Sequence, residues 1–399
     1  MHTGSGLILG IESSCDETAA AVVRGGTQVL ANVVASQIAL HANYGGVVPE
    51  LASREHLRNI VPVVRAAMAQ AQLSFPDLDA IAVTEGPGLA GALLVGITYA
   101  KALALGLDKP LIAVNHLEGH IHAVLMEAHQ KELAMQMPLL ALVVSGGHTH
   151  LYLAEEEDGT WRYRNVGRTV DDAAGEAFDK VAKLLGLGYP GGPWMDALAK
   201  HGNPKAVEFR FQEIKRRDKS ESQRTQSPGA NTEQGDAARS FDFSFSGIKT
   251  AVLRYVQTHA MQGRVEVRRA ALTAALRERP GLRAAEALGE MPQVFDQQTL
   301  DLIASFQYAV VGNLMRQSFA AAEAFGTRGI VVSGGVAANS ELRLRLTGEA
   351  NRCGLPVAFP TLAMSTDNAA MIAAAAWPKY RAGNLAGDSL VATPQLRLG

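Results

Sequence analysis

The chain has 399 residues, of which 47% are hydrophobic and 19% are charged, enough for two ordinary cores or one large two-lobed unit. Its formal net charge of −2 excludes a global field that attracts nucleic acid or membrane, so any such contact needs a local patch. The two cysteines, Cys15 and Cys353, cannot form a disulfide framework, and residues 1–10 show no signal peptide. These features predict a cytoplasmic protein.

The first two expected strands, at residues 7–12 and 19–23, are apolar runs joined by a turn rich in hydroxyl and carboxylate side chains. Asp16 and Glu17 lie in this turn. They can serve a phosphate or metal site, directly or through water, or they can simply form the turn.

Two helices are expected next. Residues 50–73 have apolar positions at a spacing of three to four, which is typical of a helix. Residues 89–107 follow a glycine turn and are rich in Gly and Ala. This composition favours a closely packed buried helix over a membrane span.

A pair of histidines opens the next expected helix, directly after a buried strand at residues 110–114. His116 and His120 are four apart, so they share one helical face and can offer two nitrogen ligands to one divalent metal. The alternative is one packed and one solvated histidine. A zinc protease of the His-Glu-x-x-His type needs a glutamate where this chain has Leu117. Glu118 lies about 200° around the helix from His116, so it is expected to point away from a metal.

Two Ser-Gly-Gly turns, at residues 145–147 and 333–335, each end a buried Val-Val strand. Glycines at such turns let backbone N–H groups approach a phosphate or another polar ligand closely. Either turn alone would be an ordinary strand end. Together, about half the chain apart, they predict a duplicated architecture of two α/β lobes with a nucleotide between them.

Three further aspartates are candidate ligands. Asp179 and Asp196 flank a Pro-Gly-Gly turn, where carboxylates suit ribose hydroxyls. Asp196 is expected near the start of its helix, where helix capping explains it nearly as well. Asp367 precedes the last expected helix, and it either caps that helix or completes a three-ligand open metal site with the two histidines.

Residues 213–240 are rich in Lys, Arg, Ser, Gln and Gly and predict a mobile surface loop. Basic residues outnumber acidic ones from Lys205 to Arg283, a bias that suits contact with phosphate backbones, although a solvated loop explains it equally well. Residues 264–291 are expected to be helical.

Eight ordered motifs resemble the tRNA adenosine threonylcarbamoyltransferases, the TsaD family once called O-sialoglycoprotein endopeptidases, and the bacterial form most closely. The similarity runs from about residue 7 to residue 377. Two segments, 213–239 and 262–292, look longer than is usual in the family. The motifs lie at residues 11–18, 101–121, 144–149, 172–180, 189–193, 243–249, 333–339 and 365–369.

The resemblance implies a two-lobed actin/Hsp70-like (ASKHA) α/β fold with duplicated RNase H-like lobes, in agreement with the two Ser-Gly-Gly turns. The expected lobes are residues 1–120 plus 365–399, and residues 121–364 with the polar insertion at about 213–240. The resemblance also implies that His116, His120 and Asp367 hold one divalent metal. The implied metal is Fe2+, with Zn2+ or another ion as the alternative.

The resemblance further implies transfer of a threonylcarbamoyl group from threonylcarbamoyl-AMP to N6 of adenosine 37, in tRNAs that read codons beginning with A. AMP is released. The implied partners are tRNA, a TsaB-like paralogue that forms a heterodimer, and a small TsaE-like P-loop ATPase. Asp16 and Glu17 are the only catalytic candidates. The implied substrate-binding residues are Val143, Val144, Ser145, Gly146, Gly147, Asp179, Gly192, Asp196 and Asn339.

Two other classes remain as alternatives: a metalloprotease, and a sugar kinase that shares the actin-like fold but needs no metal-ligating histidines. No Ser-His-Asp or Cys-His pair is evident in the sequence, and an unshifted thiol such as that of Cys15 is mostly protonated at neutral pH. The sequence therefore predicts direct transfer without a covalent enzyme intermediate.

Overall fold

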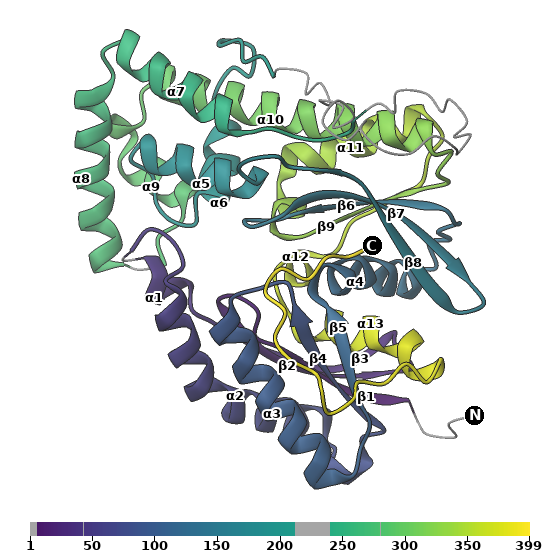
Figure 1. Ribbon diagram of the computed structural model, residues 1–399. Coiled ribbons are helices and arrows are strands. Elements are labelled where there is room, and N and C mark those ends of the chain that lie inside the picture. Colours follow the sequence, from purple (N-terminus) through teal and green to yellow (C-terminus); the bar gives the residue numbers. More distant parts are fainter. Residues whose placement is uncertain (1–5, 43, 212–239, 280) are drawn as a thin grey trace, which may run out of the picture.

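The computed structural model describes residues 6–42, 44–211, 240–279 and 281–399 (Figure 1). The predicted loop at 213–240 lies outside these residues except for Ser240. Two five-stranded mixed sheets, each covered by helices on both faces, form the centre of the molecule.

The first sheet has the strand order β3-β2-β1-β4-β5. The strands β1, β2 and β3 form an antiparallel meander, and β4 and β5 extend it in parallel from β1. Strands β1 and β4 are almost fully buried, as expected for apolar runs in the middle of a sheet. The bounds are β1 (Leu7–Glu12), β2 (Glu17–Arg24), β3 (Gln28–Ser36), β4 (Ala80–Gly86) and β5 (Leu111–Asn115).

The second sheet repeats this plan in the order β10-β9-β6-β7-β8. Here β6, β7 and β8 form the antiparallel meander, and β9 and β10 extend it in parallel from β6. The duplicated α/β architecture predicted from the two Ser-Gly-Gly turns is confirmed. The bounds are β6 (Leu139–Val144), β7 (Thr149–Glu157), β8 (Thr160–Arg168), β9 (Ile330–Ser333) and β10 (Val357–Ala358).

Helices cover both faces of each sheet (Figure 1). On the first sheet, α2 and α3 build one core and α13 builds another. The helices are α1 (Ile38–Ala42), α2 (Pro49–Ala71), α3 (Ala90–Leu107), α4 (His116–Gln130), α5 (Ala174–Leu184), α6 (Gly191–Ala199), α7 (Ser246–Thr258), α8 (Gln262–Glu278), α9 (Ala284–Glu290), α10 (Gln297–Ala324), α11 (Ser340–Arg352), α12 (Leu362–Ser365) and α13 (Ala369–Arg381), with 3-10 turns η1 (Phe75–Asp77), η2 (Pro292–Val294) and η3 (Gly335–Ala338).

Helix α4 packs between the two sheets. Its Ala123 and Met126 join the α13 core, whereas Leu117 and Ile121 join a core with β6 and β7. A Cβ at Gly119 would lie 2.9 Å from the Ile372 side chain, so glycine is what allows α13 to approach this closely. The predicted lobe boundaries, at residues 120 and 365, stay a prediction, and α4 runs continuously through the first of them.

The segment at 264–291 is expected to be helical, and most of it is. It is divided into two helices, α8 and α9. A fully buried arginine, Arg268, fixes α8 to the rest of the molecule. Its guanidinium donates to the carbonyls of Val294 (2.8 Å) and Leu185 (2.7 Å) and to the Thr299 hydroxyl (2.8 Å). Burial lowers the pKa of Arg268 to about 10, so it remains charged.

The C-terminal segment, residues 382–399, lies along both sheets. The amides of Ala386 and Thr393 donate to backbone carbonyls of the first sheet, at β5 and β4. Leu398 is buried in the core between α4 and the second sheet, and a Cβ at Gly399 would lie 2.1 Å from the Tyr163 carbonyl on β8. This segment therefore contacts both sheets, and its Arg397 carbonyl accepts a hydrogen bond from the Asn115 side chain at the start of α4.

One described helix, α3, is long and apolar enough to cross a membrane by length and composition alone. It packs against α2 and β4 as part of a core, and Ala92, Gly96, Ala100 and Ala104 lie on its buried side. Both cysteines are free.

Strands β3 and β8 were not predicted. Both are edge strands with many half-exposed residues, so they lack the continuous apolar run that marked the other strands.

Candidate metal centre

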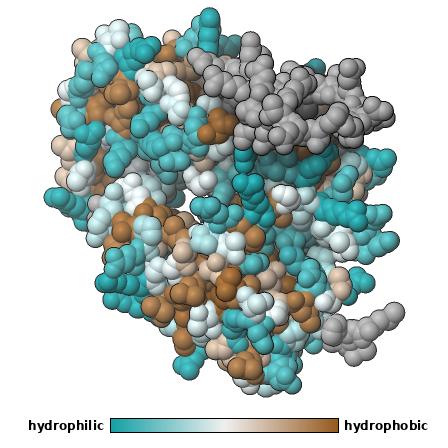
Figure 2. Space-filling view, in the orientation of Figure 1, coloured by the Kyte–Doolittle hydropathy of each residue, from teal (hydrophilic) through white to brown (hydrophobic). Residues whose placement is uncertain are grey.

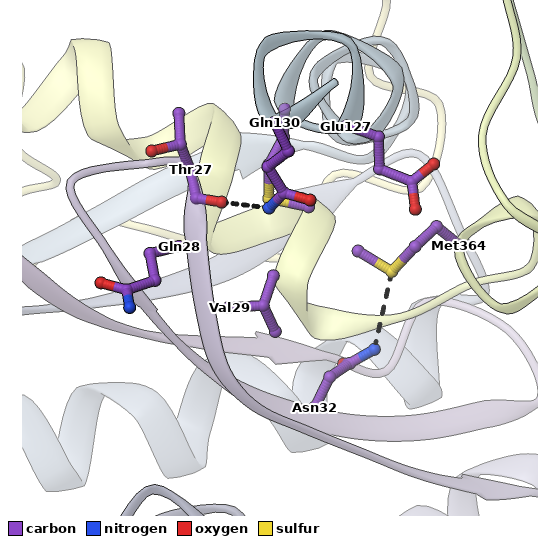
Figure 3. Close-up of a pocket in the computed structure, with 8 residues that line it drawn as sticks. Thr27, Gln28, Val29, Asn32, Glu127, Gln130 and Met364 are labelled. Carbon is purple, nitrogen blue, oxygen red and sulfur yellow. Dashed lines mark hydrogen bonds between the residues drawn. The ribbon is translucent and has the colours of Figure 1, made fainter. Parts of the chain in front are cut away.

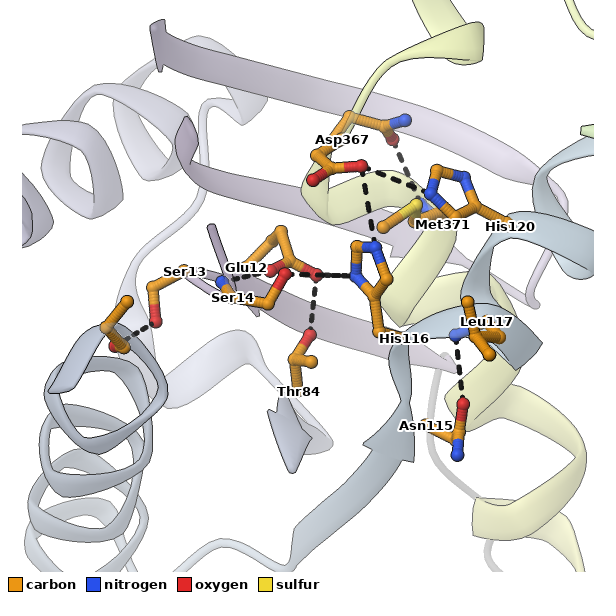
Figure 4. Close-up of polar contacts among 12 residues, drawn as sticks. Glu12, Ser13, Ser14, Thr84, Asn115, His116, Leu117, His120, Asp367 and Met371 are labelled. Carbon is orange, nitrogen blue, oxygen red and sulfur yellow. Dashed lines mark hydrogen bonds and ion pairs between the residues drawn. The ribbon is translucent and has the colours of Figure 1, made fainter. Parts of the chain in front are cut away.

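Two histidines and one aspartate from distant parts of the chain meet at the start of α4 (Figure 4). The Oδ1 atom of Asp367 lies 3.6 Å from His116 Nε2 and 3.1 Å from His120 Nε2. One candidate ligand atom from each residue lies within 4.8 Å of the other two. Both histidines are buried, and Asp367 is partly exposed. The structure therefore brings together the three residues that the sequence suggested as ligands.

Asp367 is free to face the histidines because its neighbour caps the helix. The side-chain oxygen of Asn368 accepts a hydrogen bond from the Met371 amide (3.1 Å), which makes Asn368 the N-cap of α13. The alternative that Asp367 serves only as the cap is therefore wrong. Asn368 therefore caps α13, and the adjacent Asp367 contacts the two histidines.

The buried ring nitrogens of His120 indicate that a metal fits between these residues. Both ring nitrogens of His120 are buried, and among the described residues neither makes a hydrogen bond, although Nε2 is in contact with Asp367. A buried polar atom without a partner is costly. Two imidazoles and one carboxylate are a donor set for zinc or iron that leaves coordination positions open. The residues present thus fit a divalent metal.

Glu12, at the end of β1, orients His116 and was not singled out by the sequence analysis. Its Oε2 lies 3.1 Å from His116 Nδ1 and accepts a hydrogen bond from the Thr84 hydroxyl (2.7 Å). Its Oε1 accepts from the Ser14 amide. A carboxylate that accepts from Nδ1 holds the proton there and leaves Nε2 free as a ligand. The sequence signal for this role was a lone glutamate at the end of a fully apolar strand.

The charges around these residues favour a cation. Burial alone would lower the pKa of His116, but the carboxylates of Asp367 and Glu12 outweigh it and raise that pKa to about 9. Burial acts to raise the pKa of Asp367, but His116 and His120 outweigh it and hold that pKa well below its usual range. The site attracts one positive charge, which either a proton or a metal ion can supply.

The other candidates of the first turn lie beside this group. Burial raises the pKa of Glu17 to about 9, and the negative charges of Asp367 and Asp16 add to this effect. Glu17 accepts a hydrogen bond from the Ser36 hydroxyl (3.1 Å). Burial and Asp16 also raise the pKa of the Cys15 thiol, so this thiol is not an activated nucleophile. Glu118 points elsewhere, as expected, and pairs with Lys379 at 2.8 Å.

The first Ser-Gly-Gly turn connects β6 to β7. Val143 and Val144 are buried at the end of β6, whereas Gly146 and Gly147 are exposed. Within the described part of the chain, the amides of Gly146 and Gly147 donate no hydrogen bond, so they are available to a ligand. The second turn packs directly behind. A Cβ at Gly334, whose φ is 87°, would lie 2.5 Å from the Val144 carbonyl.

The predicted ribose-binding carboxylates are engaged with helix ends. Asp179 accepts a hydrogen bond from the Gly191 amide (2.7 Å) at the start of α6. The Gly192 amide bonds to Asp179 as well. Asp196 accepts from the amide and hydroxyl of Ser340 at the start of α11. Asp196 lies in the second half of α6, so its expected position near the start of that helix is wrong.

A buried glutamine joins Asp196 to Asn339. Gln307, on α10, donates to Asp196 Oδ1 (3.3 Å) and accepts from the Asn339 side-chain amide (2.9 Å). Asn339 in turn caps α11 through the Leu342 amide. These contacts make one connected polar group beneath the second Ser-Gly-Gly turn. No pattern in the sequence distinguished Gln307 from the other polar positions of its long helix.

A separate cavity of about 480 Å³ lies where the start of β3 meets the end of α4 (Figure 3). Thr27, Val29, Gln130 and Met364 contribute to its wall. None of the predicted site residues lines this cavity, and it lies on the opposite end of α4 from the two histidines. It therefore plays no part in the candidate centre.

Comparison with solved structures defines the class of the fold. A HypF structure in a phosphate- and nucleotide-bound form aligns with 95% of this chain and 47% of its own, at a TM-score of 0.54 and 13% identity. HypF from T. kodakarensis aligns with 97% of this chain and 49% of its own, at a TM-score of 0.51 and 14% identity. With its two duplicated mixed sheets, the chain is a two-lobed α/β protein of the actin/Hsp70-like class.

Comparison of sequences then gives the family. The family described as "TsaD: tRNA N6-adenosine threonylcarbamoyltransferase" matches residues 28–374. The enzyme of that name from Koribacter versatilis is 60% identical over 393 residues, which cover 98% of this chain and 99% of the relative. The one from Symbiobacterium thermophilum is 49% identical, covering 99% and 97%. The chain belongs to the tRNA N6-adenosine threonylcarbamoyltransferase family, as the sequence motifs predicted.

Proposed function

We propose that this protein transfers the threonylcarbamoyl group of threonylcarbamoyl-AMP to N6 of adenosine 37 in tRNAs reading codons that begin with A, and releases AMP. Family membership over nearly the whole chain supports the reaction. The observation that carries the proposal is the meeting of His116, His120 and Asp367 beside the Ser-Gly-Gly turn of the second sheet.

His116 and His120, through their Nε2 atoms, and Asp367, through its carboxylate, would hold one divalent metal. By family resemblance that ion is Fe2+, with Zn2+ as the alternative. When bound, such an ion supplies a Lewis acid with open positions, able to orient and polarise an oxygen of the substrate. Glu12 keeps the His116 ring in the orientation and protonation state that this task needs.

The adenylate end of the substrate is assigned to the second sheet. The free amides of Gly146 and Gly147 suit its phosphate, and the backbone of Val143, Val144 and Ser145 shapes the turn that presents them. Asp179 and Gly192, at the start of α6, are assigned to the ribose. Asp196 and Asn339 support the same region through Gln307.

The reaction needs positioning more than it needs a nucleophilic side chain. The carbonyl of the mixed anhydride is already activated, because AMP is a good leaving group. The exocyclic N6 of adenine is a poor nucleophile, since its lone pair is delocalised into the ring. Close placement of the two groups and stabilisation of charge on the carbonyl oxygen are what the chain must supply. We infer direct transfer without an acylated enzyme, and the unactivated Cys15 supports this.

The proposed partners are tRNA, a TsaB-like paralogue and a TsaE-like P-loop ATPase, with the cytoplasm as the compartment. Apolar side chains on the outer faces of α2 and α3 offer a surface for a protein partner. Leu57 is 65% exposed and Leu94 is 58% exposed. Figure 2 shows hydrophobic residues gathered over the lower half of the molecule, where α2 and α3 lie. A heterodimer would cover this surface.

The test is reconstitution with tRNA, synthetic threonylcarbamoyl-AMP, Fe2+ or Zn2+ and the two partner proteins, followed by mass analysis of the tRNA nucleosides. We expect the modified adenosine in the complete mixture and none with Asp367→Ala. Full activity of metal-free Asp367→Ala would remove the metal from the proposal. Trapping an acylated enzyme before tRNA is added would overturn direct transfer.

The two alternative functions predict different products from the isolated chain. A metalloprotease would cleave a glycoprotein when metal is present, yet Leu117 occupies the position of the required glutamate. A sugar kinase would phosphorylate a sugar with ATP. A sugar kinase leaves the His-His-Asp group unexplained, and neither product is expected.

A further inference from the structure

His148 is a third histidine close to the metal centre, and it comes from the second sheet. It ends the Ser-Gly-Gly-His turn between β6 and β7. The Ser145 amide donates to the His148 carbonyl (2.7 Å), and the His148 amide donates to the Ser145 hydroxyl (3.1 Å). These two bonds close the turn and fix the position of the His148 backbone next to Gly146 and Gly147.

The His148 ring lies between two other imidazoles. Its centroid is 6.4 Å from that of His116 and 5.7 Å from that of His150. Burial, together with the neighbouring His116 and His150, lowers the pKa of His148 to about 3, so the ring is neutral near pH 7 and carries one N–H.

The imidazole of His148 has no partner of its own. Among the described residues, neither of its ring nitrogens makes a hydrogen bond. By contrast, His150 Nδ1 pairs with the Tyr152 hydroxyl at 2.7 Å, and His122 Nε2 pairs with the Tyr163 hydroxyl at 2.8 Å. His122 and His150 thus have hydrogen-bond partners within the chain, whereas the ring nitrogens of His148 remain available to a ligand.

The His148 ring lies between the proposed phosphate-binding turn and the proposed metal ligands. The proposed phosphate-binding amides, at Gly146 and Gly147, immediately precede His148, and the proposed metal ligand His116 lies on its other side. The carbonyl of a threonylcarbamoyl-adenylate sits between its phosphate and its amino-acid end. A substrate whose phosphate bound the Gly146 and Gly147 amides and whose other end faced His116 would bring that carbonyl near His148.

We propose that His148 is a catalytic residue that donates a hydrogen bond from its ring N–H to the carbonyl oxygen under attack. The proposal rests on the proposed transferase function. N6 of the adenine forms a bond to the carbonyl carbon, and negative charge gathers on the oxygen held by His148. The bond from carbon to the phosphate oxygen then breaks, AMP leaves with that electron pair, and the N6 proton is released to solvent. A preorganised donor of this kind contributes about 100-fold or more to the rate.

The test compares His148→Leu, which lacks the donor, with His148→Gln, which keeps an N–H. The control is His150→Gln, two residues later, on β7. The measurements are the single-turnover rate in the reconstituted complex, AMP affinity by calorimetry, bound Zn2+ by elemental analysis, and the melting temperature. We expect His148→Leu to lower the rate about 100-fold, with AMP affinity and zinc content within about threefold of wild type. His148→Gln should recover at least part of the rate, and His150→Gln should keep most of it.

Several results would overturn the inference. A wild-type rate in His148→Leu would show that the ring donates nothing in the rate-limiting step. A loss of zinc in parallel with the loss of rate would make His148 a support of the metal site. Equal losses in the leucine and glutamine variants, with all melting temperatures unchanged, would exclude a donor role. Absence of transfer by the wild-type complex would instead refute the proposed function itself. If His148→Leu melts early, His148→Ala carries the same comparison.

Discussion

Glu12 gives the sharpest test of how the metal centre is built. It is completely buried, and both of its oxygens are occupied by donors: the Ser14 amide on one, and the Thr84 hydroxyl and His116 Nδ1 on the other. Glutamine at this position has nearly the same shape, but it has one acceptor oxygen and one NH2 group. Glu12→Gln therefore cannot accept from all three donors.

Either orientation of the new amide harms the site. If its NH2 group faces His116, Nδ1 must accept, the ring proton moves to Nε2, and Nε2 is no longer a ligand. If the NH2 group faces the Ser14 amide, two N–H groups oppose each other in a dry environment. Loss of a carboxylate that supports a ligating histidine weakens metal binding by about 10- to 100-fold, or about 1.4 to 2.8 kcal/mol. We expect Glu12→Gln to lose that much affinity for Zn2+.

The assay is competition for Zn2+ between the protein and a chromophoric chelator, with circular dichroism to check the fold. Glu118→Gln is the matched control, because Glu118 is equally buried and lies on α4 two residues after His116, but pairs with Lys379. It should keep wild-type zinc affinity. Equal zinc affinity in wild type and Glu12→Gln, with both folded, would refute the role given to Glu12.

Three further outcomes follow from the structure. Replacing His116 or His120 with Ala should remove most bound metal, because each supplies one of the three ligand atoms, and elemental analysis will show it, with circular dichroism to check the fold. Arg268→Met should lower the free energy of unfolding in urea by about 3 kcal/mol, because several buried acceptors lose a charged donor. In the metal-free protein, Glu17 should make the free energy of unfolding fall as pH rises from about 4.5 to about 9. The folded state holds the proton of this carboxyl over that range and the unfolded state releases it, so the slope is at most about 1.4 kcal/mol per pH unit and is absent in Glu17→Gln.

Each of these outcomes has its own control. Wild-type metal content in both histidine variants would remove the assignment of the site. Arg269→Met changes the exposed neighbour of Arg268 and should alter stability by less than about 0.5 kcal/mol. A similar loss in both arginine variants would mean that burial of Arg268 is not the cause. For Glu17, identical pH dependence in wild type and variant would show that this carboxyl titrates normally.

Local patterns in the sequence were enough for the features that depend on a single element. The spacing of His116 and His120 placed both on one face of a helix, and the two Ser-Gly-Gly turns revealed the duplication. Motifs near Asp367 placed it in a short loop ahead of a helix, but whether it or Asn368 capped that helix was decided only by the packed structure.

Features that arise between elements were not predictable in this way. Glu12 acts on a histidine 104 residues away, and Gln307 joins Asp196 to Asn339 across three helices. His148 lay inside a recognised motif, yet nothing in its neighbours along the chain shows that its ring is without a partner. Such roles depend on which surfaces meet, and the spacing of residues within one element does not encode that.

The candidate site takes its groups from both sheets, and this has a consequence for which molecules it accepts. The metal-ligand group lies at the start of α4 and in the loop before α13, and α13 packs on the first sheet, whereas the glycine turn is carried by the second sheet. The C-terminal segment 382–399 contacts both sheets. Leu117 and Ile121 of α4 pack against the second sheet, and this packing fixes the gap between His116 and His148, whose ring centroids are 6.4 Å apart. An acyl-adenylate that contacts both the Gly146–Gly147 turn and the metal ligands must therefore match the fixed distance between them in its own length.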